Sequence, residues 1–242
     1  IARVDADAYD RTVFVAGSVG PTGEIMEPVG DLTHQLAVEV FHEQAQGLQE
    51  GGADLLWLET ISAPEEFKAA AEAFSQIELP WVGTMSFDTA GRTMMGTSPA
   101  AMVELISSIP NKPIAFGANC GTGAPDLLRT VQDFAKSSPN SNLIAKGNAG
   151  IPKYVDGQIF YDGTPELMAK YAVMARNSGA KIIGGCCGTK PEHLSSMRAA
   201  LESDVIGPVP SLQQVELEIG PFSSKIRTEI KEHKSKRRRH RV

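Results

Sequence analysis

The chain has 242 residues, of which 42% are hydrophobic, and its formal net charge is -6. These values are typical of a globular protein with one large domain or two small ones. The negative charge argues against a nucleic-acid surface over most of the protein, and no apolar stretch approaches the ~20 residues of a membrane span. We find no signal-peptide pattern at the start, and three cysteines with an adjacent pair make a poor disulfide framework. Both observations favour a reducing, cytoplasmic compartment.

Apolar segments alternate with helical patterns along the chain. Residues 1–10 resemble a helix that begins without a cap, which suggests missing upstream sequence. The expected strands are 12–20, 54–60, 81–87, 113–120, 143–150 and 182–189, and a helix is expected after each, starting near residues 34, 62, 98, 125, 164 and 189. Capping boxes are predicted at Ser62 to Glu65 and at Thr189 to Glu192.

The strands are continuous apolar runs, as in parallel sheets that are buried on both faces. No GxGxxG motif follows the first strand, which weakens a dinucleotide-binding reading. Distinctive polar and thiol residues lie at strand ends, where barrel active sites form: Ser18, Glu59, Asn119, Cys120, Asn148, Cys186 and Cys187. We therefore predict an α/β fold, a (β/α)8 TIM barrel of which the chain contains the last six strand–helix units. The first two units would precede Ile1.

All three cysteines lie at the ends of two predicted strands. Cys120 closes the segment IAFGANC, and Cys186 and Cys187 lie in IIGGCCGT, with glycine flanking both sites. Three thiolates from two strand ends could hold a zinc ion with its fourth position open, as in catalytic sites. The alternatives are cysteines that serve as small buried hydrophobes and a thiol-redox site, although a disulfide between adjacent cysteines would be strained.

These residues resemble the homocysteine S-methyltransferase family. The resemblance is carried by GANC at 117–120 and GGCCGT at 184–189, and it extends through VAGSVGPTGE, EGGADLLWLET, DTAGRTMMG and GNAG over about residues 1–200. The family includes betaine-, S-methylmethionine- and cobalamin-dependent enzymes. The resemblance implies a zinc-containing barrel that methylates homocysteine to methionine.

By that resemblance the zinc ligands fall on Cys120, Cys186 and Cys187, and the residue that binds the homocysteine amino group falls on Glu59. Asn119 and Asn148 match strand-end positions near the substrate. The domain expectation is a homocysteine-binding barrel over 1–204 and a C-terminal extension over 205–242 that ends in a basic tail. The family's Asp-Gly-rich first strand and Thr-Asn-Thr-like second strand are not found here, so one side of the homocysteine pocket is expected to be unformed.

The leading hypothesis is zinc-dependent methyl transfer from a small onium donor, betaine first, to homocysteine. Runner-up donors are S-methylmethionine and a cobalamin system on separate chains, and a different class is a non-catalytic zinc-binding barrel fragment. We expect homocysteine and a small donor as partners, with no nucleic acid and no membrane; a homo-oligomer is compatible with the sequence. The tail KEHKSKRRRHRV holds seven of the 23 Lys and Arg residues and is expected to be solvated. His34, His42 and His193 are expected at the surface.

Overall fold

The computed structural model describes residues 1–88, 90–151, 153–155 and 157–224. The expected basic tail therefore lies outside the described residues. Within them, no helix is long and apolar enough to cross a membrane.

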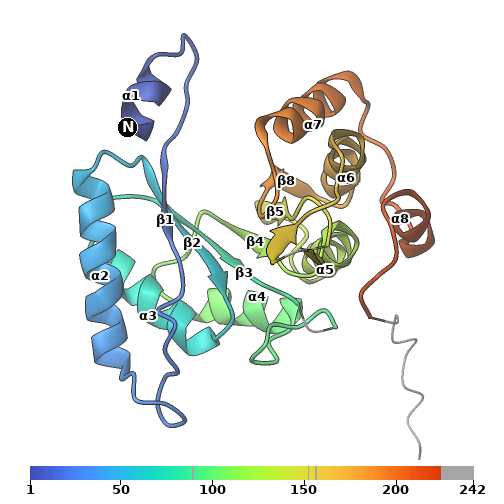
Figure 1. Cartoon of the computed structure of the whole chain (residues 1–242). Coiled ribbons are helices and arrows are strands. Elements are labelled where there is room, and N and C mark those ends of the chain that lie inside the picture. The colour runs from blue at the N-terminus through green and yellow to red at the C-terminus, as the bar shows by residue number, and fades with distance from the viewer. Residues whose placement is uncertain (89, 152, 156, 225–242) are drawn as a thin grey trace, which may run out of the picture.

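A six-stranded, fully parallel sheet forms the centre of the molecule, in the order β1-β2-β3-β4-β5-β8 (Figure 1). Its strands are β1 (Ala16–Val19), β2 (Leu55–Ile61), β3 (Trp81–Met85), β4 (Ala115–Cys120), β5 (Leu143–Gly147) and β8 (Ala180–Gly185). The helices are α1 (Ala2–Asp7), α2 (His34–Glu50), α3 (Pro64–Phe74), α4 (Pro99–Ser108), α5 (Ala124–Ser137), α6 (Pro165–Asn177), α7 (Pro191–Ser203) and α8 (Leu212–Glu218). A helix follows every strand of the sheet, so the predicted α/β class with six strand–helix units is confirmed.

The sheet curves, and its helices lie along the outer side (Figure 1). The main core fills the layer between sheet and helices, where the ring of Trp81 packs against Phe67 and Phe74 at centroid distances of 5.6 and 5.4 Å. Burying each such side chain stabilises the fold by ~1.5–3 kcal/mol. A separate apolar cluster on the inner face contains the buried residues Val82, Ala115 and Ile144.

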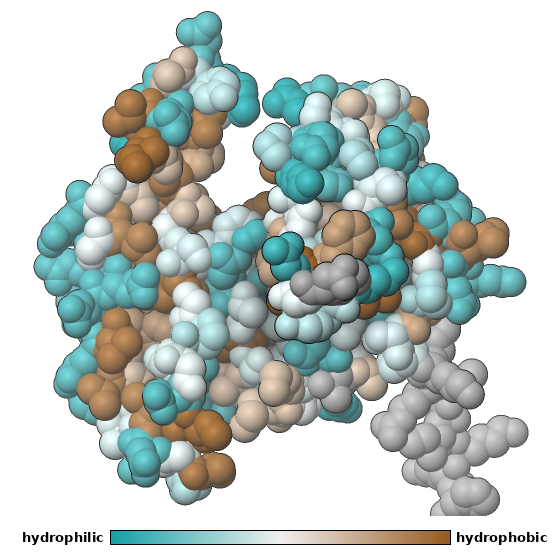
Figure 2. Space-filling model, viewed as in Figure 1, coloured by the Kyte–Doolittle hydropathy of each residue, from teal (hydrophilic) through white to brown (hydrophobic). Residues whose placement is uncertain are grey.

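The inner face of the sheet is open at one side. Among the described residues, β1 pairs only with β2, and β8 pairs only with β5. The space-filling view shows the surface hollowed between the N-terminal segment and the side formed by α6 and α7 (Figure 2). Polar side chains near the carboxyl ends of the strands are therefore reachable from this face.

Two predicted capping boxes are wrong, and the reason is the same in both. Proline takes the first helical position in α3 and α7, so each helix starts one residue later than the predicted box requires. Ala63 is the cap residue of α3 and makes no side-chain bond. At α7 the backbone N–H of Lys190 donates to Nδ1 of His193 over 2.9 Å.

Two further elements were not foreseen. The segment between β5 and α6, for which the sequence predicts neither strand nor helix, contains an antiparallel hairpin of β6 (Lys153–Val155) and β7 (Gln158–Phe160). After α7, the chain packs back on the body: Nε2 of Gln132 donates to the Pro210 carbonyl over 2.8 Å, and Val215 of α8 is fully buried. Part of the predicted extension is thus joined to the outer helices.

Candidate metal centre

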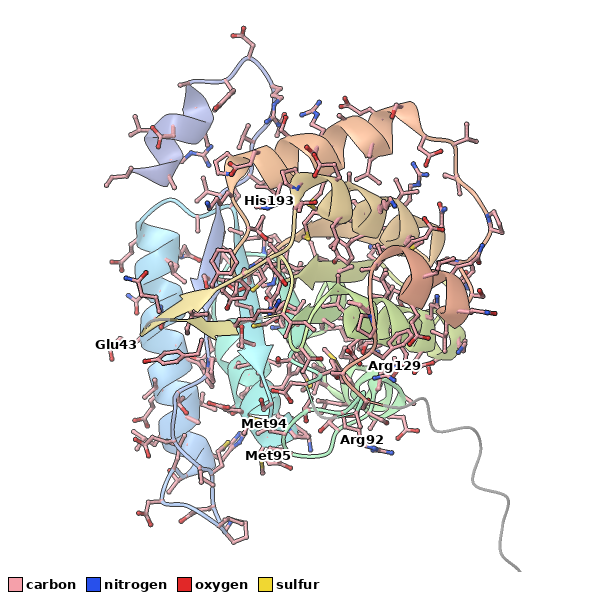
Figure 3. The ribbon with its side chains drawn as sticks, turned by 45° about the vertical axis from the view of Figure 1, so that its right-hand side comes forward. Glu43, Arg92, Met94, Met95, Arg129 and His193 are labelled. Atoms are coloured by element: carbon pink, nitrogen blue, oxygen red, sulfur yellow. The ribbon has the colours of Figure 1, made fainter. Side chains whose placement is uncertain are left out.

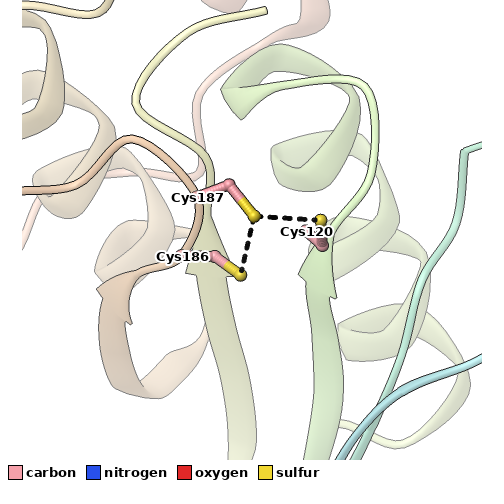
Figure 4. Close-up of side chains that lie close together, drawn as sticks. All are labelled: Cys120, Cys186 and Cys187. Atoms are coloured by element: carbon pink, nitrogen blue, oxygen red, sulfur yellow. Dashed lines mark hydrogen bonds between the residues drawn. The ribbon is translucent and has the colours of Figure 1, made fainter. Parts of the chain in front are cut away.

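The three cysteine thiols converge at the carboxyl ends of β4 and β8 (Figure 4). The Sγ atom of Cys187 lies 3.8 Å from Sγ of Cys120 and 4.0 Å from Sγ of Cys186, and all three sulfur atoms lie within 4.8 Å of one another. A tetrahedral zinc ion with Zn–S bonds of ~2.3 Å requires sulfur atoms ~3.8 Å apart. The spacing therefore fits a zinc ion with three protein ligands and one open position.

Backbone geometry turns the thiols toward one another. Cys120 has a φ of 60° and Gly121 a φ of 76°, so the chain bends sharply at the end of β4. Left-handed backbone in a residue other than glycine costs of the order of 1–3 kcal/mol and is concentrated at functional sites. Cys186 is fixed from β5, because its backbone N–H donates to the Gly147 carbonyl over 2.7 Å.

The thiols perturb one another's ionisation. The pKa of the Cys186 thiol is lowered to about 5 by its hydrogen bond with Cys120, with further contributions from the Asn119 amide and the charge of Lys146. The pKa of Cys120 is raised, because it shares that hydrogen bond and is half-buried. One thiol of the cluster thus ionises readily while the next holds its proton. Occupation by a metal would require the remaining protons to leave.

Asn119 connects the metal centre to the end of β2. Its Oδ1 accepts from the backbone N–H of Thr60 and its Nδ2 donates to Thr60 Oγ1, both over 2.8 Å. Nδ2 also lies 3.8 Å from Sγ of Cys186. Thr60 has a φ of 65°, an outlier for a β-branched residue. Asn119 is fully buried and engaged on both amide atoms, so its geometry suits an orienting role.

Asn148 connects the two cysteine segments. Its Nδ2 donates to the Gly121 carbonyl over 2.9 Å, and its Oδ1 accepts from the backbone N–H of Cys187 over 3.2 Å. The side chain is 1% exposed. Such outer contacts hold metal ligands in place and tune their affinity.

Glu59 lies near the end of β2 and forms an ion pair with Lys146 of β5. Its other oxygen, Oε1, accepts from the Ser18 hydroxyl over 2.6 Å. The Lys146 ammonium also lies 5.0 Å from the centre of the Trp57 ring. The pair spans the inner face, because β3 and β4 separate the two strands.

The structure adds two residues to the site that the strand-end pattern did not single out. Lys146 lies two positions before Asn148 in the strand expected over 143–150, and residues two apart on a strand share a face, so this spacing is a usable signal even though β5 ends at Gly147. Tyr161 follows the β6–β7 hairpin, and its ring packs against Gly188, where a Cβ would lie 2.3 Å from Cγ of Tyr161. Burial and the neighbouring Cys187 raise the pKa of its phenol. No local pattern marked Tyr161, since the hairpin itself was not foreseen.

Polar residues elsewhere in the fold have partners of their own, and Figure 3 shows where His193 and Arg92 lie. His193 was expected at the surface but is 6% exposed, because its ring caps α7 and its Nε2 bonds the Gly163 carbonyl over 2.9 Å. In the loop between β3 and α4, Arg92 donates to the Gly96 carbonyl over 2.9 Å, beside the exposed Met94 and Met95. His34 pairs with Glu72 on the outer helices.

Comparison with known proteins decides the family. Residues 1–201 match the family model described as homocysteine S-methyltransferase. The chain belongs to the homocysteine S-methyltransferase family. The resemblance based on the cysteine motifs is thereby confirmed.

Solved structures with a similar fold include the homocysteine methyltransferase MmuM from Escherichia coli. Its apo form matches with a TM-score of 0.65 at 24% identity, covering 82% of this chain and 66% of that chain. The metallated and oxidized forms each match with a TM-score of 0.62 at 24% identity, covering 82% of this chain and 65% of theirs. The chain therefore spans slightly less than two thirds of the length of MmuM.

Proposed function

We propose that this protein is a zinc-dependent methyltransferase that transfers a methyl group to homocysteine and forms methionine. The observation that carries the proposal is the three-thiol cluster, whose spacing suits zinc with one position open. Membership of the family supports the acceptor, and the metallated form of MmuM supports a metal.

The same three cysteines, Cys120, Cys186 and Cys187, are the proposed ligands. Zinc bound there would favour the thiolate form of the homocysteine sulfur, whose free pKa is near ~8.5. Asn119 and Asn148 would hold the ligand-bearing backbone, and Glu59 would bind the substrate ammonium group. In the transfer, a carbon–sulfur bond forms between homocysteine and the methyl group, and the thiol proton passes to solvent. With betaine, the carbon–nitrogen bond to that methyl group breaks and dimethylglycine leaves. With S-methylmethionine, a carbon–sulfur bond of the sulfonium breaks and methionine leaves.

For the donor we propose a small onium compound, with betaine first and S-methylmethionine as the alternative. Three thiolates and one zinc ion carry a net negative charge, which favours the approach of a positively charged methyl donor. The ring of Tyr161 packs beside Gly188, next to the thiols, and is an aromatic face of the kind that binds onium groups.

The proposal is tested by metal analysis together with methionine formation. We expect about one zinc per chain in the purified protein and methionine from homocysteine with betaine, with S-methylmethionine or with methylcobalamin. Cys120→Ser should lose both zinc and turnover. The matched control is His34→Ala, which removes an exposed ligand atom on the outer helix α2 and should keep both.

The outcomes separate the three classes of function. Zinc without turnover with any donor would leave a non-catalytic zinc-binding protein. A reducible disulfide among the cysteines with no stoichiometric zinc would favour the thiol-redox reading. Turnover with one donor alone would identify that donor.

A further inference from the structure

The ion pair between Glu59 and Lys146 occupies the place where the substrate is proposed to bind. Side-chain exposure is 18% for Glu59 and 24% for Lys146, so the pair is shielded but still reachable from the open inner face. Ion pairs that only brace a fold are often as exposed as this one. What distinguishes the pair is its place on the inner face, beside the strand ends that carry the thiols.

Lys146 is held close to the metal centre by the strand register. It precedes Gly147, whose carbonyl accepts the backbone N–H of Cys186 over 2.7 Å, and it pairs across the sheet with Asn119. On the next strand Gly184 has no side chain, and a Cβ there would lie 3.8 Å from Cγ of Lys146. The alkyl chain of Lys146 is thus free to run along the inner face of the sheet.

The charges of the pair are complementary to those of an α-amino acid. Homocysteine carries an ammonium and a carboxylate on one carbon, and Glu59 and Lys146 present a carboxylate and an ammonium in contact. A carboxylate has about four lone-pair sites, so Glu59 can accept a further donor beside the Ser18 hydroxyl. Glu59 and the thiolates are negatively charged, so a substrate carboxylate bound beside them would need a cationic partner.

We propose that Lys146 binds the carboxylate of homocysteine while Glu59 binds its ammonium group, so that the ion pair of the free protein opens into a two-point site for the amino acid. The inference rests on the proposed function, because it takes homocysteine as the ligand. It assigns Lys146 as a specificity-determining residue. Betaine also carries a carboxylate, so the test must show whether Lys146 binds the methyl acceptor, homocysteine, or the methyl donor.

The test compares three thiols by isothermal titration calorimetry on the zinc-loaded protein: homocysteine, 3-aminopropane-1-thiol, which lacks the carboxylate, and 4-sulfanylbutanoate, which lacks the ammonium. Lys146→Met should weaken homocysteine and 4-sulfanylbutanoate about 10- to 100-fold, and leave 3-aminopropane-1-thiol within about threefold. Glu59→Gln should weaken homocysteine and 3-aminopropane-1-thiol by a similar factor and leave 4-sulfanylbutanoate within about threefold. Lys146→Arg should restore part of the affinity, because a guanidinium also pairs with carboxylates.

Lys153→Met is the matched control, since Lys153 forms an exposed ion pair with Asp162 and should affect none of the three thiols. Equal losses for all three thiols in Lys146→Met would refute the carboxylate role and leave Lys146 as a brace for Glu59. Betaine is titrated in the same way, and a loss in Lys146→Met that is confined to betaine would assign Lys146 to the methyl donor and refute the proposal. If the zinc-loaded wild type does not bind homocysteine, whether or not it binds the other two thiols, the proposed function itself fails, and this inference fails with it.

Discussion

Replacement of Asn119 by alanine tests how the metal centre is joined to the substrate side of the pocket. The Asn119 amide makes two hydrogen bonds of 2.8 Å to Thr60, one of them to the backbone N–H. Thr60 has a φ of 65°, which a β-branched residue adopts only when its surroundings enforce it. Without the amide, the Thr60 N–H loses its acceptor and the turn after Glu59 loses its constraint.

The expected cost follows from these contacts. Two hydrogen bonds contribute about 1 kcal/mol each, and the partly buried Thr60 N–H, left without its acceptor, adds the lower end of a penalty of ~1–3 kcal/mol. We expect Asn119→Ala to lower the free energy of unfolding by about 3 kcal/mol. For a domain of this size the melting temperature should fall by ~6–12 °C. Zinc affinity should also fall ~10–100-fold, because Nδ2 of Asn119 lies 3.8 Å from Sγ of Cys186.

The assay is urea unfolding together with competitive zinc titration. Asn142→Ala is the matched control: Asn142 also makes two hydrogen bonds, to the Ile114 carbonyl and from Lys181, but it is exposed and away from the thiols. Its cost should stay below about 1 kcal/mol, with no change in zinc affinity. Equal costs for the two variants, or unchanged zinc binding in Asn119→Ala, would refute the reasoning.

Two further changes probe the frame of the site. Tyr171→Phe removes the phenol oxygen that accepts the Gly147 N–H over 3.0 Å in a fully buried position, and should cost ~1–3 kcal/mol in urea unfolding; an unchanged midpoint would contradict this. The Val15 N–H and Arg3 lower the pKa of Asp54 in the folded protein. Its contribution to stability is therefore fully present above the unfolded pKa of ~3.9, and it is lost as the pH falls through the lower folded pKa. Asp54→Asn should therefore be less stable than wild type at pH 7 and converge with it in acid; a constant difference at all pH values would count against that ion pair.

Much of the site was predictable because parallel strands bring their carboxyl ends to one edge. Cys120 and the pair Cys186 and Cys187 were assigned to strand ends from local sequence, and the sheet order makes their strands near neighbours. Glu59 was placed at the same edge by the same reasoning. Helix starts were predicted less well, since proline at the first helical position displaced two caps by one residue.

The sequence by itself determined the order of the strand–helix units, the three thiols and the family, because apolar runs, glycine and cysteine act within short segments. Tertiary structure alone decided which charges meet. Glu59 and Lys146 are 87 residues apart, and their contact depends on the curvature of the sheet across β3 and β4. The hydrogen bonds between Asn119 and Thr60 likewise depend on the relative positions of β4 and β2 in the folded sheet. Side chains on non-adjacent strands meet through folding in three dimensions, which no local pattern encodes.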